Sequence, residues 1–91
     1  MTYLKVKRIH PVPDQPVSTY SELDDERWEL RKVEIFPDGR ILYADPDVEF
    51  EETGLSTMPY PSFEEIATNP KYDAKVISNA EFEKIWAMAT A

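Results

Sequence analysis

The amino-acid sequence predicts an α+β fold: an antiparallel sheet of about four strands, arranged as a meander, with two C-terminal helices packed on one face. The residues from Arg27 to Asp45 (RWELRKVEIFPDGRILYAD) place two apolar-rich runs around Pro37-Asp38-Gly39, a turn cluster typical of a β-hairpin. Ser62 and Ser78 each open a segment with capping-box spacing, which indicates a helix start. Strand-like segments thus come first and helix-like segments last.

Two strands are expected before the hairpin. The first spans residues 2–10, where apolar side chains alternate with lysines. The prolines that follow hold the connection extended and cannot donate to a ladder. The second spans residues 17–23 (VSTYSEL), which are rich in β-branched, hydroxyl and aromatic side chains. A polar turn at residues 24–26 then leads into the third strand.

The third strand has an irregular apolar pattern. Trp28 and Leu30 share one face, whereas Val33 and Ile35 have the opposite parity. One extra residue would return both later side chains to the core, so we predict a β-bulge or a strong bend at Arg31-Lys32. The alternative is a sheet whose two faces are both partly covered.

The second half of the chain predicts a loop and a short helix after the last strand. Residues 40–44 form that strand, and residues 46–61 form a long acidic loop of a kind that is usually functional or mobile. A helix starts at Ser62 and stops before Asn69-Pro70. Residues 72–77 are interpreted as a linker or a brief strand.

The last predicted helix begins behind Ser78. Phe82, Ile85, Trp86 and Ala89 follow the i, i+3, i+4, i+7 spacing of one helical face. We expect Trp86 to anchor this helix onto the sheet.

The length of 91 residues predicts a single domain, with strands within residues 2–45, the acidic loop at 46–61 and helices within 62–90. The net charge of −8 divides into −1 for residues 1–44 and −7 for residues 45–91. Such a field repels nucleic acid and anionic lipid and attracts cationic partners, so we expect neither direct nucleic-acid binding nor membrane binding. The alternative is that the acidity only keeps a small domain in solution.

No secretory leader or membrane span is expected. Residues 1–10 already alternate like a strand, and the longest apolar run is far shorter than the roughly 20 residues that cross a bilayer. The sequence therefore predicts a cytoplasmic protein.

Side chains able to carry chemistry are few. His10 is the one histidine, there is no cysteine, and no Gly-x-Ser-x-Gly elbow occurs, so we assign no catalytic residue. The carboxylates after Asp45 alternate as in a calcium loop, but Phe50 and Ser56 stand where an EF-hand requires glycine and glutamate. Gly39 and Gly54 both have turn explanations, so no phosphate cradle is expected. The sequence indicates no metal site and no cofactor, and we predict that the protein is not an enzyme.

The remaining candidate is a surface. In a meander, the turn after the second strand and the loop after the fourth emerge at the same end of the sheet. The acidic side chains of both would form one rim, with Tyr60 as an aromatic anchor and Phe50 as a further candidate. The aromatic groups would supply affinity, and the charges would raise the association rate. The predicted partner-binding residues are Asp24, Asp25, Glu26, Asp45, Asp47, Glu49, Glu51, Glu52 and Tyr60.

The chain also resembles a family of small bacterial domains of unknown function. The resemblance covers nearly the whole chain, through KVKRIH, YSELDDERWELRKVEIFPDGRILYAD, PSFEEI and ISNAEFEKIW. It carries no established catalytic residues, so no site transfers. In general style, short and acidic and ending in a capped helix, the chain is also similar to immunity proteins of bacterial toxin systems.

The functional hypothesis is a non-enzymatic binding protein of the immunity type, whose acidic rim covers a basic partner surface such as that of a toxin domain. The alternative is a small-molecule-binding or accessory domain with a pocket between the sheet and residues 50–60. Four tyrosines are its candidate lining: Tyr3, Tyr20, Tyr43 and Tyr60.

Overall fold

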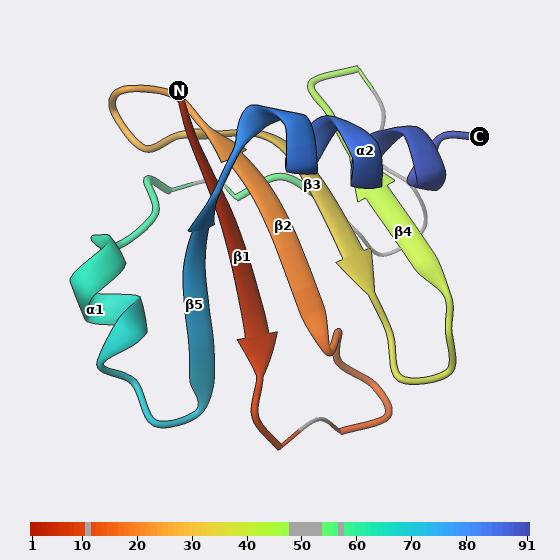
Figure 1. The fold of residues 1–91 in the computed structure, drawn as a ribbon, viewed down its shortest axis with the longest axis horizontal. Helices are drawn as coiled ribbons and strands as arrows, with labels where there is room; N and C mark the ends of the chain where they lie inside the picture. Colours follow the sequence, from red (N-terminus) through yellow and green to blue (C-terminus); the bar gives the residue numbers. More distant parts are fainter. Residues whose placement is uncertain (11, 48–53, 57) are drawn as a thin grey trace.

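The computed structural model describes residues 1–10, 12–47, 54–56 and 58–91. These residues form five β-strands and two α-helices, arranged as in Figure 1. The strands are β1 (Thr2–Arg8), β2 (Ser18–Leu23), β3 (Glu29–Ile35), β4 (Ile41–Ala44) and β5 (Tyr72–Ile77), and the helices are α1 (Phe63–Ala67) and α2 (Asn79–Ala89). The predicted α+β class is confirmed.

The strands form one open sheet in the order β4-β3-β2-β1-β5, with every neighbouring pair antiparallel. The first four strands make the predicted meander, but the expected strand count was one too low. Residues 72–77, for which the sequence allows a linker or a brief strand, form a strand, and Leu4 faces Val76 across the β1–β5 ladder. The reason is that β1 has a second edge whose backbone groups need partners, and β5 supplies them.

The predicted hairpin joins β3 to β4. The amide of Phe36 donates to the carbonyl of Arg40 at 2.9 Å, and the amide of Gly39 donates to the carbonyl of Phe36 at 3.0 Å. Gly39 has φ +91°, a conformation that L-residues other than glycine rarely adopt. The Asp38 side chain accepts from the Arg40 amide at 3.1 Å, so the turn residues act as the sequence predicted.

The irregularity in the third strand is a register shift against β2. Glu22 pairs with Arg31, whereas Leu23 pairs with Glu29, which leaves Leu30 as the extra residue. The bulge thus lies one position before the predicted Arg31-Lys32. Its effect is the predicted change of phase, which places Glu29 and Arg31 on opposite faces of the sheet.

Each face of the sheet has its own cover, and the two helices lie on opposite faces rather than on one. We call the side beneath α2 the helix face, where the Phe82 ring lies 5.4 Å from the Tyr3 ring. We call the other side the loop face, where Lys32 Nζ donates to the carbonyl of Gly54 at 2.8 Å and α1 packs near β5. In Figure 1, α2 crosses in front of the strands, and the segment leading to α1 passes behind them. In the chain, β5 lies between the two helices and joins α1 on the loop face to α2 on the helix face.

Both helices begin at the predicted caps. Ser62 Oγ accepts from the Glu65 amide at 3.2 Å, and Ser78 Oγ accepts from the Glu81 amide at 3.1 Å. The buried apolar side chains come from both layers of the fold, so the core is divided by the sheet: Leu4, Leu23, Val33, Phe36, Leu42, Ala44 and Phe82.

Candidate functional site

The acidic turn and the segment after β4 lie at the same end of the sheet. β2 ends at Leu23 and β4 ends at Ala44, and both run antiparallel to β3, so both chains leave the sheet at this end. The N-terminus is there too, because its amino group lies 3.4 Å from the carboxylate of Asp25. We call this part of the surface the acidic end, and Figure 1 shows it at the top of the sheet.

Asp24 builds the turn rather than projecting from it. Its Oδ1 accepts from the amides of Glu26 and Trp28, both at 2.9 Å. The amide of Arg27 donates to the carbonyl of Asp24 at 2.9 Å, and Arg27 has φ +68°. Asp25 and Glu26 therefore form the exposed tip of the turn, where the Asp25 side chain is 97% exposed.

The second predicted part of the rim is described only as far as residue 47. Asp45 Oδ1 accepts from the Asp47 amide at 2.9 Å, which turns the chain as it leaves β4. Asp47 is exposed. The predicted rim residues Glu49, Glu51 and Glu52 lie outside the described residues, as does Phe50.

Tyr60, expected as the aromatic anchor of the rim, instead directs its hydroxyl group inward on the loop face. That hydroxyl donates to Glu29 Oε2 at 2.7 Å and lies 2.9 Å from Ser21 Oγ. Burial, and then the negative charge of Glu29, raises the pKa of Tyr60 above its usual value. The backbone beside it is also fixed, because the Tyr60 amide donates to the carbonyl of Arg27 at 2.8 Å. Tyr60 therefore holds the segment before α1 against the sheet.

Trp28 is an aromatic side chain exposed at the acidic end. Trp28 was not among the predicted partner-binding residues, but it is 40% exposed and stands in the same turn as Asp25 and Glu26. Its position follows from the hydrogen bond that its backbone amide donates to the Asp24 carboxylate, which keeps Trp28 in the turn instead of the strand. An aspartate four residues before a tryptophan, at the head of a strand, was the available signal.

A buried polar cluster below the loop face was not predicted. The Glu29 side chain is fully buried, and its carboxylate accepts from the Ser56 amide and from Ser21 Oγ, both at 2.8 Å. Lys32 Nζ lies 3.2 Å from Glu29 Oε1 and supplies the counter-charge. With Tyr60, these groups use both oxygens of Glu29, as a buried carboxylate requires. The cluster holds the segment before α1 against β2 and β3.

A second charged cluster holds α2 on the helix face. Arg31 makes two bonds of 2.8 Å to the carboxylate of Glu22 and one of 2.5 Å to Glu83 on α2. Its guanidinium carbon lies 4.9 Å from the centre of the Phe82 ring and 5.1 Å from that of Trp86. The hydrogen bonds from Arg31 hold the pKa of Glu22 below its usual value. Trp86 thus anchors α2 as predicted.

The four tyrosines proposed as a pocket lining do not meet. The rings of Tyr43 and Trp86 meet edge to face, and the Tyr3 ring contacts that of Phe82, so both tyrosines belong to the helix face. Tyr20 is on the same face, because it pairs with Lys5 at an even spacing from Tyr3. Of these four tyrosines, Tyr60 is the one on the loop face.

A cavity on the loop face does lie between the sheet and the segment before α1. It measures about 230 Å³. Its lining comes from β1, β2, α1 and β5: Val6, Arg8, Thr19, Tyr60, Pro61, Ile66 and Tyr72. His10 lies elsewhere, exposed after β1, where it borders a separate hollow with Arg8 and Lys71.

The fold and the surface together define a small α+β domain, built on an open antiparallel sheet of five described strands. The chain belongs to a family described as a domain of unknown function (DUF6881), which matches residues 2–91. No curated protein and no solved structure matched the chain in comparison.

Two further findings concern the described residues alone. Within residues 1–10, 12–47, 54–56 and 58–91, no group of three or more His, Cys, Asp or Glu side chains could hold a metal ion. In the same part of the chain, no helix has the length and apolar character needed to cross a membrane.

Proposed function

We propose that this chain is a non-enzymatic protein-binding domain whose acidic end docks on a basic surface of another protein. Such a surface is found on toxin domains that act on nucleic acid, and an inhibitor of the immunity type would cover it. The proposal rests on one observation above all: Trp28 stands half-exposed in the same turn as Asp25 and Glu26, with Asp47 exposed at the same end.

This combination suits recognition of a cationic partner. Exposed carboxylates attract a basic surface over about one Debye length, roughly 8 Å at physiological salt, and so raise the association rate. A tryptophan ring supplies the apolar contact area that charges lack, and tryptophan is among the residues that dominate binding energy at interfaces.

The turn that carries these side chains is held in place before any partner arrives. The Asp24 side chain closes the turn by accepting hydrogen bonds from two backbone amides. The guanidinium group of Arg27 donates two hydrogen bonds, of 2.7 and 3.0 Å, to the carbonyl of Pro61. A preformed turn loses little conformational entropy on binding, which favours affinity.

The experiment is affinity capture from lysate of the source organism, followed by binding measurements on the captured protein at two salt concentrations. The test variant is Asp25→Lys with Glu26→Lys, and its control is Asp14→Lys with Glu64→Lys, which changes the net charge equally at exposed sites away from the acidic end. We expect the test variant to bind at least tenfold more weakly and with a flatter salt dependence. Equal affinities of the two variants would contradict the proposal.

A second candidate function has one observation in its favour, the cavity of about 230 Å³ beside Tyr60 and Ile66. It would make the chain a small-molecule-binding or accessory domain. A thermal-shift screen against metabolites tests it, because a ligand of the native state raises the melting temperature by mass action. A ligand whose effect survives Asp25→Lys with Glu26→Lys, and is lost in Ile66→Trp, would favour this second function.

A further inference from the structure

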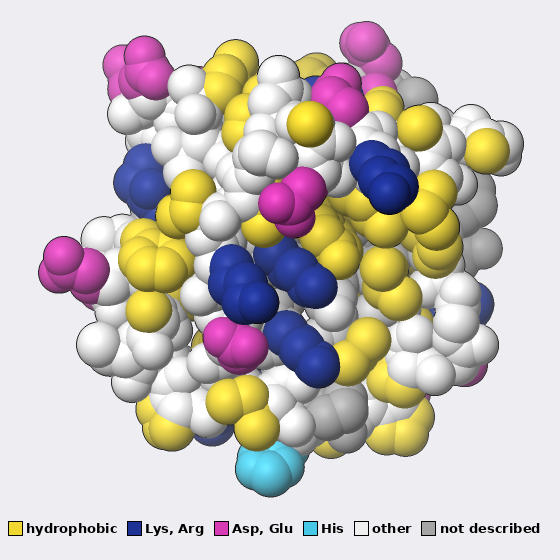
Figure 2. Space-filling model, viewed as in Figure 1, with side chains coloured by type: hydrophobic (Ala, Val, Ile, Leu, Met, Phe, Trp, Pro, Cys, Tyr) yellow, Lys and Arg dark blue, Asp and Glu magenta, His cyan; other side chains and the backbone are white. Residues whose placement is uncertain are grey.

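Three lysines gather on the part of the helix face that α2 leaves uncovered. Lys5 and Lys7 come from β1, and Lys75 comes from β5, where it stands directly opposite Lys5 in the ladder. They line a hollow of about 120 Å³ together with Asp73. Figure 2 shows basic side chains grouped near the middle of this face, below the level of α2 in Figure 1.

Within the part of the chain that the structure describes, these three ammonium groups form no ion pair. Among the described residues, none of the three has a carboxylate oxygen within 4.0 Å, although Asp73 borders the same hollow. Lys5 and Lys75 form a directly opposed pair of like charges, which destabilises a sheet. Asp73 stands opposite Lys7 in the ladder, so the three lysines and this aspartate leave a net positive charge in the hollow. In a chain with 18 acidic residues, this local excess of positive charge indicates a site for an anion.

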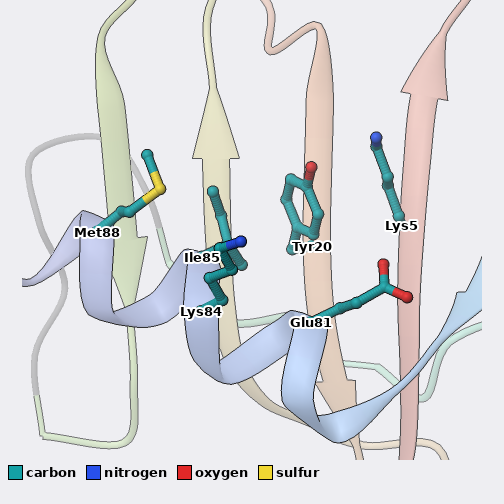
Figure 3. A pocket seen from close by; sticks show the side chains of 6 residues that line it. All are labelled: Lys5, Tyr20, Glu81, Lys84, Ile85 and Met88. Carbon is teal, nitrogen blue, oxygen red and sulfur yellow. The ribbon is translucent and has the colours of Figure 1, made fainter.

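A second hollow continues from the lysines toward α2 and differs in character. It measures about 260 Å³ and shares Lys5 with the first. Tyr20 from β2, with Ile85 and Met88 from α2, provides its apolar walls, and the Met88 side chain is 58% exposed. Figure 3 shows Lys5 and Tyr20 extending side by side from neighbouring strands, away from the helix, and Lys5 Nζ lies 5.6 Å from the centre of the Tyr20 ring.

We infer that the two hollows form one binding groove for a small organic phosphate, in which a planar apolar group is joined to a phosphate monoester. The planar group lies against Tyr20, Ile85 and Met88. The phosphate lies among the ammonium groups of Lys5, Lys7 and Lys75, which offer donors to its oxygens.

The net charges of the two hollows favour this orientation, because three lysines outweigh Asp73 in the first, whereas Glu81 and Lys84 balance each other in the second apart from the shared Lys5. The carboxylate of Glu81 repels a phosphate placed in the apolar part and so offsets the attraction of Lys84. Salt screens charges more than about 8 Å away, so the lysines act on a compact bound anion more strongly than the carboxylates of the acidic end do. A long polyanion such as nucleic acid or an anionic membrane also meets the excess negative charge of the rest of the chain. The inference is independent of the proposed docking at the acidic end.

The probe for this groove is 1-naphthyl phosphate, which combines both required groups. Its titration into ¹⁵N-labelled protein at low salt, followed by amide chemical shifts, should give saturable changes around Lys5, Tyr20, Lys75 and Ile85. We expect 1-naphthol and inorganic phosphate, which each carry one of the two groups, to bind at least tenfold more weakly. Shifts confined to other residues, or no saturable binding at millimolar concentration, would overturn the inference.

Matched variants then test the lysines. Lys5→Gln with Lys75→Gln should weaken binding at least tenfold, whereas Arg40→Gln with Lys71→Gln, which removes the same charge elsewhere, should leave the affinity within about twofold. Equal affinities of the two variants would show that the lysines form no site. Lys75 is exposed, so Lys75→Gln alone keeps the test available if the double variant folds poorly. Tighter binding of a phosphotyrosine peptide than of 1-naphthyl phosphate would overturn the inferred ligand class, because it would indicate a phosphorylated protein segment as the ligand.

Discussion

The hydroxyl group of Tyr60 lies 2.7 Å from Oε2 of Glu29, which joins the segment before α1 to a strand in the interior of the sheet. The bond links positions 31 residues apart in the chain. The same carboxylate also accepts a hydrogen bond from the amide of Ser56, so Glu29 holds two parts of the segment before α1 against the sheet.

Removal of the Tyr60 hydroxyl should therefore destabilise the fold. In Tyr60→Phe, Glu29 and Ser21 each lose a partner while remaining buried, so we expect the free energy of unfolding to fall by about 1–3 kcal/mol. Urea denaturation measures it. Tyr72→Phe is the control, because no hydrogen bond to its hydroxyl group is found among the described residues; an equal loss in both variants would mean that the cluster is not the cause.

Acid should weaken the attachment of α2 through Glu22. The folded-state pKa of Glu22 lies below its ordinary value of 4.5, so this group contributes stability above pH 4.5 that is lost as the pH falls through the folded-state pKa. We expect the free energy of unfolding to fall less steeply with acid in Glu22→Gln than in the wild type. Denaturant titrations at a series of pH values test this. Glu64→Gln, at an exposed site, should keep the wild-type slope.

The ring of Phe82 should be the most sensitive apolar group of α2. It is fully buried, and its ring contacts those of Tyr3 and Trp86. Phe82→Ala removes this ring from a packed site and should cost about 3–5 kcal/mol, a large share of the stability of a domain of this size. Thermal unfolding followed by circular dichroism gives the result. Met88→Ala, at a largely exposed position of the same helix, should change the melting temperature little, and the reverse order of effects would contradict the assigned packing.

The hairpin turn should tolerate asparagine but not alanine at Gly39. Its φ of +91° strains an alanine by about 1–2 kcal/mol even though a Cβ there would meet no atom within 4 Å. Asparagine visits positive φ more readily, so Gly39→Asn should lose less of the free energy of unfolding than Gly39→Ala. Equal losses in urea denaturation would point to a cause other than the backbone conformation.

Local patterns in the sequence predicted most of the fold. The turn at Pro37-Asp38-Gly39 and the caps at Ser62 and Ser78 follow from side chains that bond to their own neighbours, so the sequence around them is sufficient. The partner of β5 depends instead on which edge of the sheet remains open, which no local pattern specifies. The number of strands and the faces of the helices were therefore wrong in detail.

The candidate site was less predictable for a related reason. Burial decides the role of a side chain, and burial depends on the whole fold. Tyr60 turns inward because Glu29, an acidic residue in a strand, is buried and accepts a hydrogen bond from the tyrosine hydroxyl. Trp28 is exposed because its amide is hydrogen-bonded to Asp24 in the turn. The lysines of β1 were visible as one face of a strand, but Lys75 joined them only through the β1–β5 ladder.

The position of β5 beside β1 has a consequence for biosynthesis. The meander of β1 to β4 can assemble as it leaves the ribosome, but one edge of β1 stays open until residues 72–77 emerge and pair with residues 3–8. Contacts between such distant positions close late and slow folding. During that interval the nascent sheet exposes an edge able to pair with other chains, and the lysines along β1 reduce that danger by mutual repulsion.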